Sequence, residues 1–125
     1  MEVIPKSSSL VAYRGEEKVA FMCKAYITPN QMLRWHVTHF SSCKTKTIAL
    51  GYYLHDPNST KYSVSGYWSP DLEEVDVLEI HNIEFDDAGE YICSESPDNV
   101  ADPDSASITL TVFNCTMREG KYYHN

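Results

Sequence analysis

The chain has 125 residues, of which 42% are hydrophobic, and a formal net charge of −8. This length suits a single domain with its own hydrophobic core. The negative charge argues against binding nucleic acid through its phosphates, which needs a basic patch. No run of about 18 apolar residues occurs, so the sequence predicts no membrane-spanning helix.

The first residues, Met1 to Pro5, lack the charged and apolar regions of a signal peptide. We therefore expect Met1 to be a start codon added to an excised fragment. The natural signal and any membrane anchor are then expected to lie outside this sequence.

The cysteines and two sequons indicate an exported protein. An even number of widely spaced cysteines favours disulfides in an oxidising compartment, and no Cys-x-x-Cys pair indicates a zinc knuckle or a thioredoxin-like site. Asn58 and Asn114 each begin an Asn-x-Ser/Thr sequon, which predicts glycosylation, with Asn58 the better candidate. The cysteines are Cys23, Cys43, Cys93 and Cys115.

In the first half of the chain, apolar residues alternate with polar ones over short stretches. Val19, Phe21 and Cys23 share one face of such a stretch, which is typical of a half-buried strand. The predicted elements are an edge segment at 1–9, strands at 10–13, 18–23, 32–38 and 46–53, and a loop at 55–59.

The second half continues the pattern. We expect strands at 61–64, 75–83, 90–96 and 105–113, irregular chain at Gly66 and at 69–71, a corner at 84–89 and an acidic loop at 97–104. Residues 114–125 show no core pattern and predict a stalk or tail. Many short strands, with a turn signal about every ten residues and no helical periodicity, predict an all-β sandwich.

The stretch from Asp87 to Cys93 carries the most specific motif, Asp-x-Gly-x-Tyr-x-Cys. It predicts a tight corner followed by a strand, with Gly89 relieving backbone strain. Asp87 can accept hydrogen bonds from the neighbouring backbone or pair with a cation. Tyr91 and Cys93 are two residues apart and so share a strand face.

Together with Cys23, Trp35 and the pattern Leu78-x-Ile80-x-x-Ile83, this motif resembles the immunoglobulin superfamily over about residues 10–113. The resemblance implies a Cys23–Cys93 disulfide covered by Trp35, and a tyrosine corner at Tyr91. The two cysteines are 70 positions apart, which leaves room for extra strands. We therefore expect a variable-type (V-set) sandwich with sheets A′BED and GFCC′C″ over residues 1–113.

The resemblance also implies a pair between Lys61 and Asp87. Arginine is the commoner residue at the position of Lys61, so bidentate geometry would be lost here. Rearranged antigen receptors carry a Phe/Trp-Gly-x-Gly bulge before the last strand, and residues 102–107 lack its glycines. The chain thus looks like a domain of an innate receptor, adhesion molecule or costimulatory ligand.

The other two cysteines lie outside the family pattern. In the expected fold, Cys43 follows strand C and Cys115 follows strand G, so both lie at the same end of the domain. Strands G and C are about 10 Å apart, but a loop and a tail can bend across the strand between them. We predict a Cys43–Cys115 bridge. The alternative is that Cys115 pairs with another chain and Cys43 stays free.

Two surfaces are candidates for binding a partner. Variable-type domains bind through the GFCC′ face or through loops at one end. The candidate face residues are Arg34, His36, Thr38, Glu90, Ile92 and Ser94, with Tyr52 and Tyr53 as aromatic anchors. The candidate loop residues are Pro97, Asp98, Asn99 and Asp102. For the tyrosines, packing on the sheet is an equally good interpretation.

No pattern indicates catalysis. The sequence has no nucleophile elbow and no Gly-rich phosphate loop, and His36 and His39 face opposite sides of a strand. Asp98, Asp102 and Asp104 could ligate calcium, but they lack the spacing of a calcium loop and are better explained as solvated. We expect no enzyme activity, no metal and no cofactor.

We therefore expect an extracellular recognition or adhesion domain, at a cell surface or secreted, that binds a protein ligand or a second copy of itself through the GFCC′ face. One alternative is a secreted immune effector that binds microbial or carbohydrate surfaces through its loops. Another is a structural spacer in a multidomain chain.

Overall fold

The computed structural model describes the backbone of residues 2–4, 9–96, 105–118 and 121–124, and the side chains of residues 9–96 and 105–114. Most of this part folds into strands. It contains a single turn of 3-10 helix, η1 (Phe85–Asp87), and no α-helix. The described residues include no helix long and apolar enough to cross a membrane.

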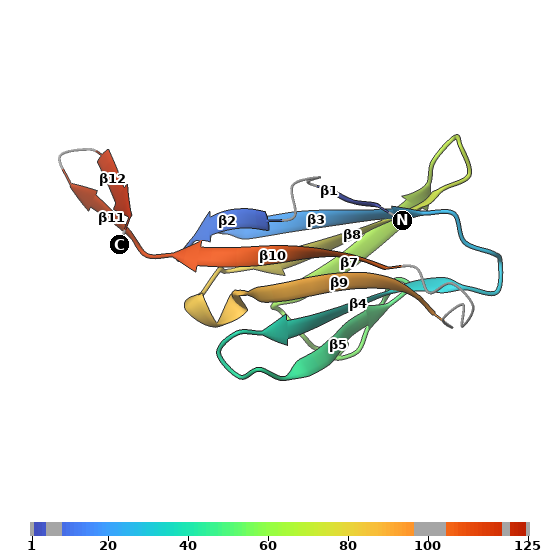
Figure 1. The fold of residues 1–125 in the computed structure, drawn as a ribbon, viewed down its shortest axis with the longest axis horizontal. Helices are drawn as coiled ribbons and strands as arrows, with labels where there is room; N and C mark the ends of the chain where they lie inside the picture. Colours follow the sequence, from blue (N-terminus) through green and yellow to red (C-terminus); the bar gives the residue numbers. More distant parts are fainter. Residues whose placement is uncertain (1, 5–8, 97–104, 119–120, 125) are drawn as a thin grey trace.

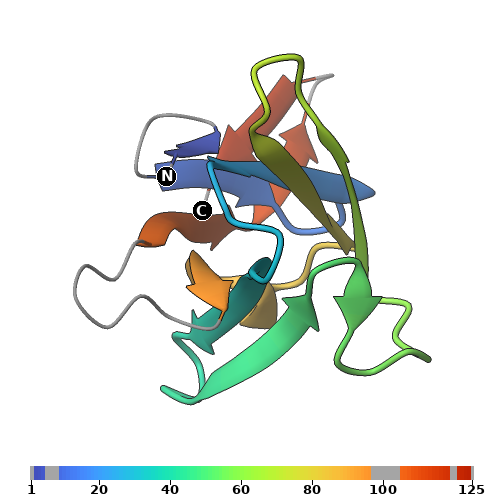
Figure 2. The same ribbon diagram turned by 90° about the vertical axis from the view of Figure 1, so that its right-hand side faces the viewer.

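Most strands belong to two sheets that enclose the core (Figures 1 and 2). The four-stranded sheet is ordered β1 (Glu2–Ile4), β3 (Lys18–Ala25), β8 (Glu74–His81), β7 (Tyr62–Trp68). The six-stranded sheet is ordered β2 (Ser9–Tyr13), β10 (Ser105–Phe113), β9 (Gly89–Ser96), β4 (Met32–His39), β5 (Thr45–Leu50), β6 (Tyr53–Leu54). The predicted all-β two-sheet fold is confirmed.

The core forms where the alternating apolar positions of the two sheets meet. Cys23 of β3 and Cys93 of β9 form a buried disulfide that joins the sheets, with their Cα atoms 6.4 Å apart. Trp35 is fully buried and lies opposite Cys93 in the β4–β9 ladder. Its indole Nε1 has no hydrogen-bond partner among the described residues, so Trp35 contributes through apolar packing.

The sequence predicted a strand at residues 10–13 without assigning it to a sheet. They form β2, which pairs in parallel with β10 from Ser9–Thr109 to Tyr13–Phe113 and so joins the six-stranded sheet. β1 pairs with β3 in the other sheet. The alternation of apolar and polar residues predicts which face of an edge strand is buried, as at Ala12. It does not predict the sheet, because the strand can bury that face as an edge of either one.

The single strand expected at 46–53 is divided in two. Gly51, with φ of +59°, forms a turn between β5 and β6. The β4–β5 register also shifts between Trp35 and His36. This bulge lets Ile48 and Ala49 both be buried and leaves Leu50 40% exposed.

Several further boundaries differ from expectation. β7 continues to Trp68 and includes Gly66, which was expected in irregular chain. β8 begins at Glu74, one residue earlier than expected. In the expected tail, β11 (Cys115–Arg118) and β12 (Lys121–His124) form a separate antiparallel hairpin beyond the sandwich (Figure 1). By contrast, the bounds predicted for β10 agree with the structure.

Candidate binding surfaces

The corner before β9 sets the position of this central strand. The Tyr91 hydroxyl donates a hydrogen bond to the Asp87 carbonyl at 2.6 Å, which is the geometry of a tyrosine corner. The carboxylate of Asp87 pairs with Lys61 Nζ at 2.9 Å and accepts the Glu84 backbone N–H at 2.8 Å. The structure thus brings together the residues that the motif singled out.

Gly89 is needed for a different reason from the one expected. A positive φ occurs at Gly15 and Gly51 but not at Gly89. A Cβ atom at Gly89 would instead lie 2.5 Å from the carbonyl oxygen of Thr38 in β4. Glycine therefore allows β9 and β4 to approach closely at the start of their ladder.

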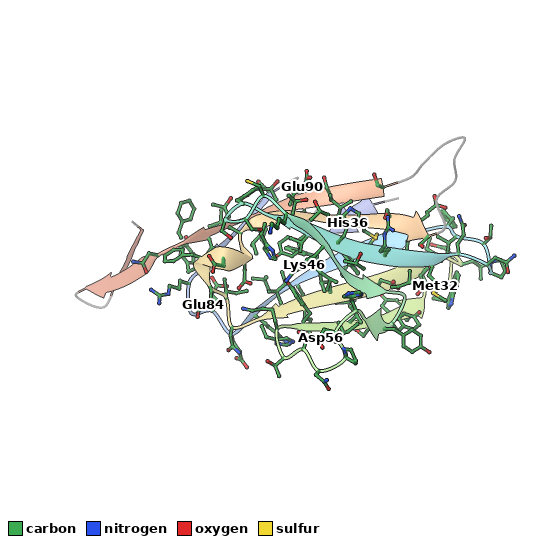
Figure 3. All side chains as sticks on the ribbon, turned by 90° about the horizontal axis from the view of Figure 1, so that it is seen from below. Met32, His36, Lys46, Asp56, Glu84 and Glu90 are labelled. Atoms are coloured by element: carbon green, nitrogen blue, oxygen red, sulfur yellow. A yellow bond between two sulfur atoms is a disulfide. The ribbon has the colours of Figure 1, made fainter. Side chains whose placement is uncertain are left out.

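The outer face of the six-stranded sheet, opposite the core, holds most of the predicted face residues. In the ladders, Arg34 lies between Ser94 and Leu50, His36 lies between Ile92 and Thr47, and Thr38 lies between Glu90 and Thr45. Figure 3 labels His36 and Glu90 on this face.

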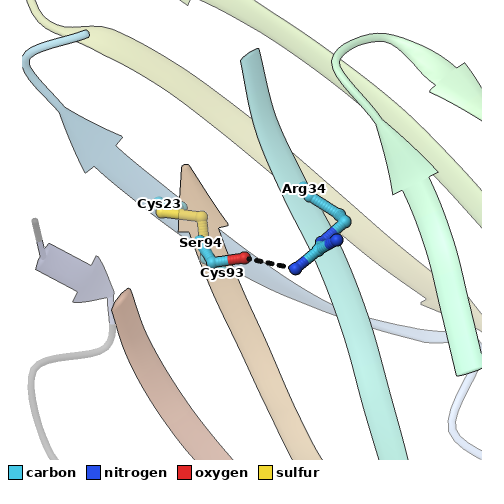
Figure 4. The surroundings of a disulfide bond; sticks show 4 residues. All are labelled: Cys23, Arg34, Cys93 and Ser94. Atoms are coloured by element: carbon cyan, nitrogen blue, oxygen red, sulfur yellow. Dashed lines mark hydrogen bonds between the residues drawn. A yellow bond between two sulfur atoms is a disulfide. The ribbon is translucent and has the colours of Figure 1, made fainter. Parts of the chain in front are cut away.

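One of these residues is poorly placed for contact with a partner. Ser94 is only 7% exposed, and its Oγ accepts a hydrogen bond from Arg34 Nη2 at 3.5 Å (Figure 4). The Arg34 side chain therefore covers Ser94. Ser94 therefore exposes little surface of its own in this structure, and its role in binding stays a prediction.

The two predicted tyrosines are placed differently. Tyr53, 76% exposed, begins β6 and pairs with Leu50, so it lies on the outer face at the edge of the sheet. Tyr52, 47% exposed, lies in the turn between β5 and β6. Its hydroxyl donates a hydrogen bond to Glu74 Oε1, which belongs to the other sheet, so Tyr52 lies at the end of the sandwich rather than on the outer face.

The predicted loop contacts Pro97, Asp98, Asn99 and Asp102 lie outside the described residues, as does Asp104, the third acid weighed as a calcium ligand. Within the described part, no three His, Cys, Asp or Glu side chains are arranged to hold a metal ion.

Cys43 is exposed and is a free thiol, so the predicted bridge to Cys115 is absent from this structure. Cys43 lies in the β4–β5 turn and its Sγ contacts the Phe40 carbonyl oxygen at 3.8 Å. The backbone explains the difference, because β11 begins at Cys115 and leads the chain into the outlying β11–β12 hairpin (Figure 1). The side chain of Cys115 lies outside the described residues.

The two sequon asparagines differ in accessibility. Asn58 is exposed in the loop between β6 and β7, where its backbone N–H donates to Asp56 Oδ1 at 3.1 Å. Asn114 is half-buried, directly after β10. Accessibility therefore favours Asn58, in agreement with the prediction.

A further group of side chains was missed by the sequence reasoning. The inward positions of β8 are Ile80 and Leu78, followed by the acids Asp76 and Glu74, which are 1% and 5% exposed. The sequence signal that could have found them is the two-residue spacing of the inward positions, which continues from apolar to acidic residues. The same holds in β9, where Glu95, 9% exposed, continues the inward row of Tyr91 and Cys93.

The environment of Asp76 favours its protonated form. Burial raises the pKa of this carboxyl to about 8, and the neighbouring Glu74 carboxyl acts in the same direction. Burial and the hydrogen bond to Glu74 also raise the pKa of Tyr52 well above its ordinary value. This end of the sandwich therefore buries carboxyl groups in its interior, which is unusual for such side chains.

No protein-family profile and no curated protein matches the chain. Some 1300 chains of solved structures do match it. One belongs to a structure described as "Structural basis of T cell specificity and activation by the bacterial superantigen toxic shock syndrome toxin-1". It has a TM-score of 0.63 and 16% identity, over 89% of this chain and 96% of that one. At this identity the likeness shows only the fold, an all-β two-sheet sandwich whose buried disulfide is compatible with an immunoglobulin-like domain.

Proposed function

We propose that the chain is a variable-type immunoglobulin domain that recognises a protein outside the cell through the outer face of its six-stranded sheet. The strand order supports the variable type, since β10-β9-β4-β5-β6 corresponds to G-F-C-C′-C″ and β1, β3, β8 and β7 correspond to A, B, E and D. The buried disulfide supports an oxidising compartment.

The composition of the outer face carries the proposal. At the outer-face positions of the β10–β9, β9–β4 and β4–β5 ladders, Arg34 and Glu90 are the only Lys, Arg, Asp or Glu side chains, although the chain has a net charge of −8. The other positions are mostly Ser and Thr, with Ile92, Leu50 and Met32 as apolar elements. Interface centres are typically depleted in charge and hold a few apolar anchors.

A substitution at Ile92 tests this proposal. Ile92 is half-buried next to His36 at the middle of the outer face. Ile92→Glu should abolish binding of the bead-displayed domain to cells. It should also abolish any self-association measured by analytical ultracentrifugation. The reason is that the new carboxylate would lose its water when a partner covers the face, which is costly for an unpaired charge.

Ala20→Glu is the matched control. Ala20 is exposed on β3, on the outer side of the other sheet. The control should bind as the unmodified domain does. Unchanged binding in both variants would assign recognition to another surface. Equal loss in both would show that the effect is not specific to the outer face, and would contradict the proposal.

A further inference from the structure

A small cavity opens at the end of the sandwich where β4 starts and β8 starts, the end that faces the viewer in Figure 2. It has a volume of about 180 Å³. We call it the end cavity. The lining that matters here is Met32, Tyr52, Tyr53, Trp68, Glu74 and Asp76.

Asp76 is the unusual member of the lining. It is 1% exposed, and its carboxyl oxygens receive no hydrogen bond from a donor group of the described residues; its polar neighbour is the Glu74 carboxyl. A buried polar group without a partner carries a free-energy penalty that a suitable ligand can remove. Glu74, beside it on the same face of β8, is paired with the Tyr52 hydroxyl.

A glycine keeps this space open. Gly66 of β7 lies opposite Asp76 in the β7–β8 ladder. A Cβ at Gly66 would be 2.4 Å from the Tyr52 ring and 2.7 Å from Asp76 Oδ1. The arrangement of acid and aromatic ring therefore depends on the absence of a side chain at this position.

The lining selects a cation. It holds two carboxyl groups and three aromatic rings, with no Lys, Arg or His. Trp68 is 52% exposed and can offer its ring to an incoming charge, and an aromatic face attracts a cation within about 6 Å. A metal ion fits poorly, because the described residues lack a set of three suitable ligands.

The size of the cavity and the shape of candidate head groups narrow the class of cationic ligand further. Cavities for whole small molecules are usually about 300–1,000 Å³, so this one is suited to a single head group. A guanidinium is planar, donates up to five hydrogen bonds, pairs with carboxylates side-on and stacks on aromatic rings. An alkylammonium would use the charge but not the planar stacking.

We propose that the end cavity binds the guanidinium group of an arginine side chain. Asp76 and Glu74 accept its hydrogen bonds, and Tyr52 and Trp68 border its plane. The proposal does not rest on binding through the outer face, since the cavity is lined by residues of both sheets, although Met32 borders both surfaces.

Titration followed by NMR tests the proposal with three probes. The short peptide Ac-Gly-Arg-Gly-NH₂ and free methylguanidinium should both cause saturable shifts of the Trp68 indole signal, which is distinct from that of buried Trp35. The citrulline analogue of the peptide, which has the same shape without the charge, should not. Tighter binding of the peptide assigns the natural source to a protein chain, and tighter binding of methylguanidinium assigns it to a free organic cation.

Asp76→Asn and Glu74→Gln each replace a carboxyl group with an amide of similar shape. The amide cannot take the negative charge that pairs with a cation, so each variant should weaken binding about tenfold or more. Glu79→Gln is the matched control, since Glu79 lies on the same strand but on its outer side, paired with Lys18. The control should bind as the unmodified domain does.

Two results would overturn the proposal. The first is the absence of saturation by either cation, which would leave the cavity to solvent. The second is an equal loss of affinity in Glu79→Gln, which would show attraction by the overall negative charge. Should Asp76→Asn unfold, Glu74→Gln and Tyr52→Phe test the same contacts.

Discussion

Asp87 illustrates how one side chain can hold a structural motif together. Its side chain is 7% exposed and pairs with Lys61, whose own side chain is 33% exposed, at 2.9 Å. Lys61 also donates to the Asn82 carbonyl at 2.9 Å, so it links the start of β7 to the chain that follows β8. A largely buried carboxylate that loses its cation becomes an uncompensated charge.

We therefore expect Lys61→Met to lower the free energy of unfolding by about 1–3 kcal/mol. Lys18→Met, which breaks the exposed pair with Glu79 at 3.0 Å, should cost less than about 1 kcal/mol. Urea denaturation measures both. Similar losses in the two variants would contradict the structural role assigned to Lys61.

Asp76 should control how stability depends on pH. Its pKa in the folded protein is about 8, against an ordinary value of 3.8. Between these two values the folded state binds more protons than the unfolded state, so the free energy of unfolding falls as pH rises. The stability due to the protonated form is complete below pH of about 4 and is lost as pH rises through about 8.

In Asp76→Asn this slope should flatten, because the amide does not ionise. At pH of about 9 the variant should be more stable than the unmodified domain by roughly 1–3 kcal/mol, the scale of a buried polar penalty. Urea denaturation at several pH values checks this. An unchanged slope would mean that Asp76 is ionised in the folded protein at neutral pH.

At the level of elements, the β4–β5 turn differs from expectation because Cys43 is a free thiol there and not part of the predicted disulfide. Cys43 adopts a φ of +57°, which is unfavourable for a side chain with a Cβ, and it is exposed. Its backbone N–H donates to the His39 carbonyl at 2.8 Å, which closes the turn without any disulfide.

Cys43 should therefore react with iodoacetamide in the native protein without a reducing agent. Cys23 and Cys93 should stay unmodified, because both are fully buried in their disulfide. Peptide mass spectrometry after alkylation identifies the labelled position. A Cys43 that reacts only after reduction would support a bridge to Cys115 or to another chain.

Individual strands were predictable where apolar alternation was unbroken, as at Leu33, Trp35 and Val37, all of which are buried. Burial was not predictable where the inward position is polar. Asp76 and Glu74 continue the inward row of Ile80 and Leu78, but an acidic residue at such a position predicts that the buried part of the strand has ended. Their burial depends on Gly66 and Tyr52, which are distant in sequence.

For the whole molecule, the Asp87–Cys93 motif and its partners Cys23 and Trp35 were sufficient to predict the two-sheet sandwich. Sheet membership of the edge strand β2 was not predictable, because it depends on pairing energies between distant strands rather than on the local pattern. The split of the expected strand 46–53 into β5 and β6 at Gly51 was not predictable either, since the β4–β5 bulge that accompanies it depends on both strands. Local periodicity specifies burial, whereas topology needs long-range pairing.

The parallel pairing of β2 with β10 has a mechanical consequence. When the two ends of the domain are pulled apart and β1 has separated from β3, β2 is loaded at its first residue, Ser9, and β10 at its last residue, Phe113. Because the strands run in the same direction, this force slides one along the other and loads the ladder from Ser9–Thr109 to Tyr13–Phe113 all at once. An antiparallel pair of terminal strands would open one hydrogen bond at a time, so this domain is built to resist tension between its ends.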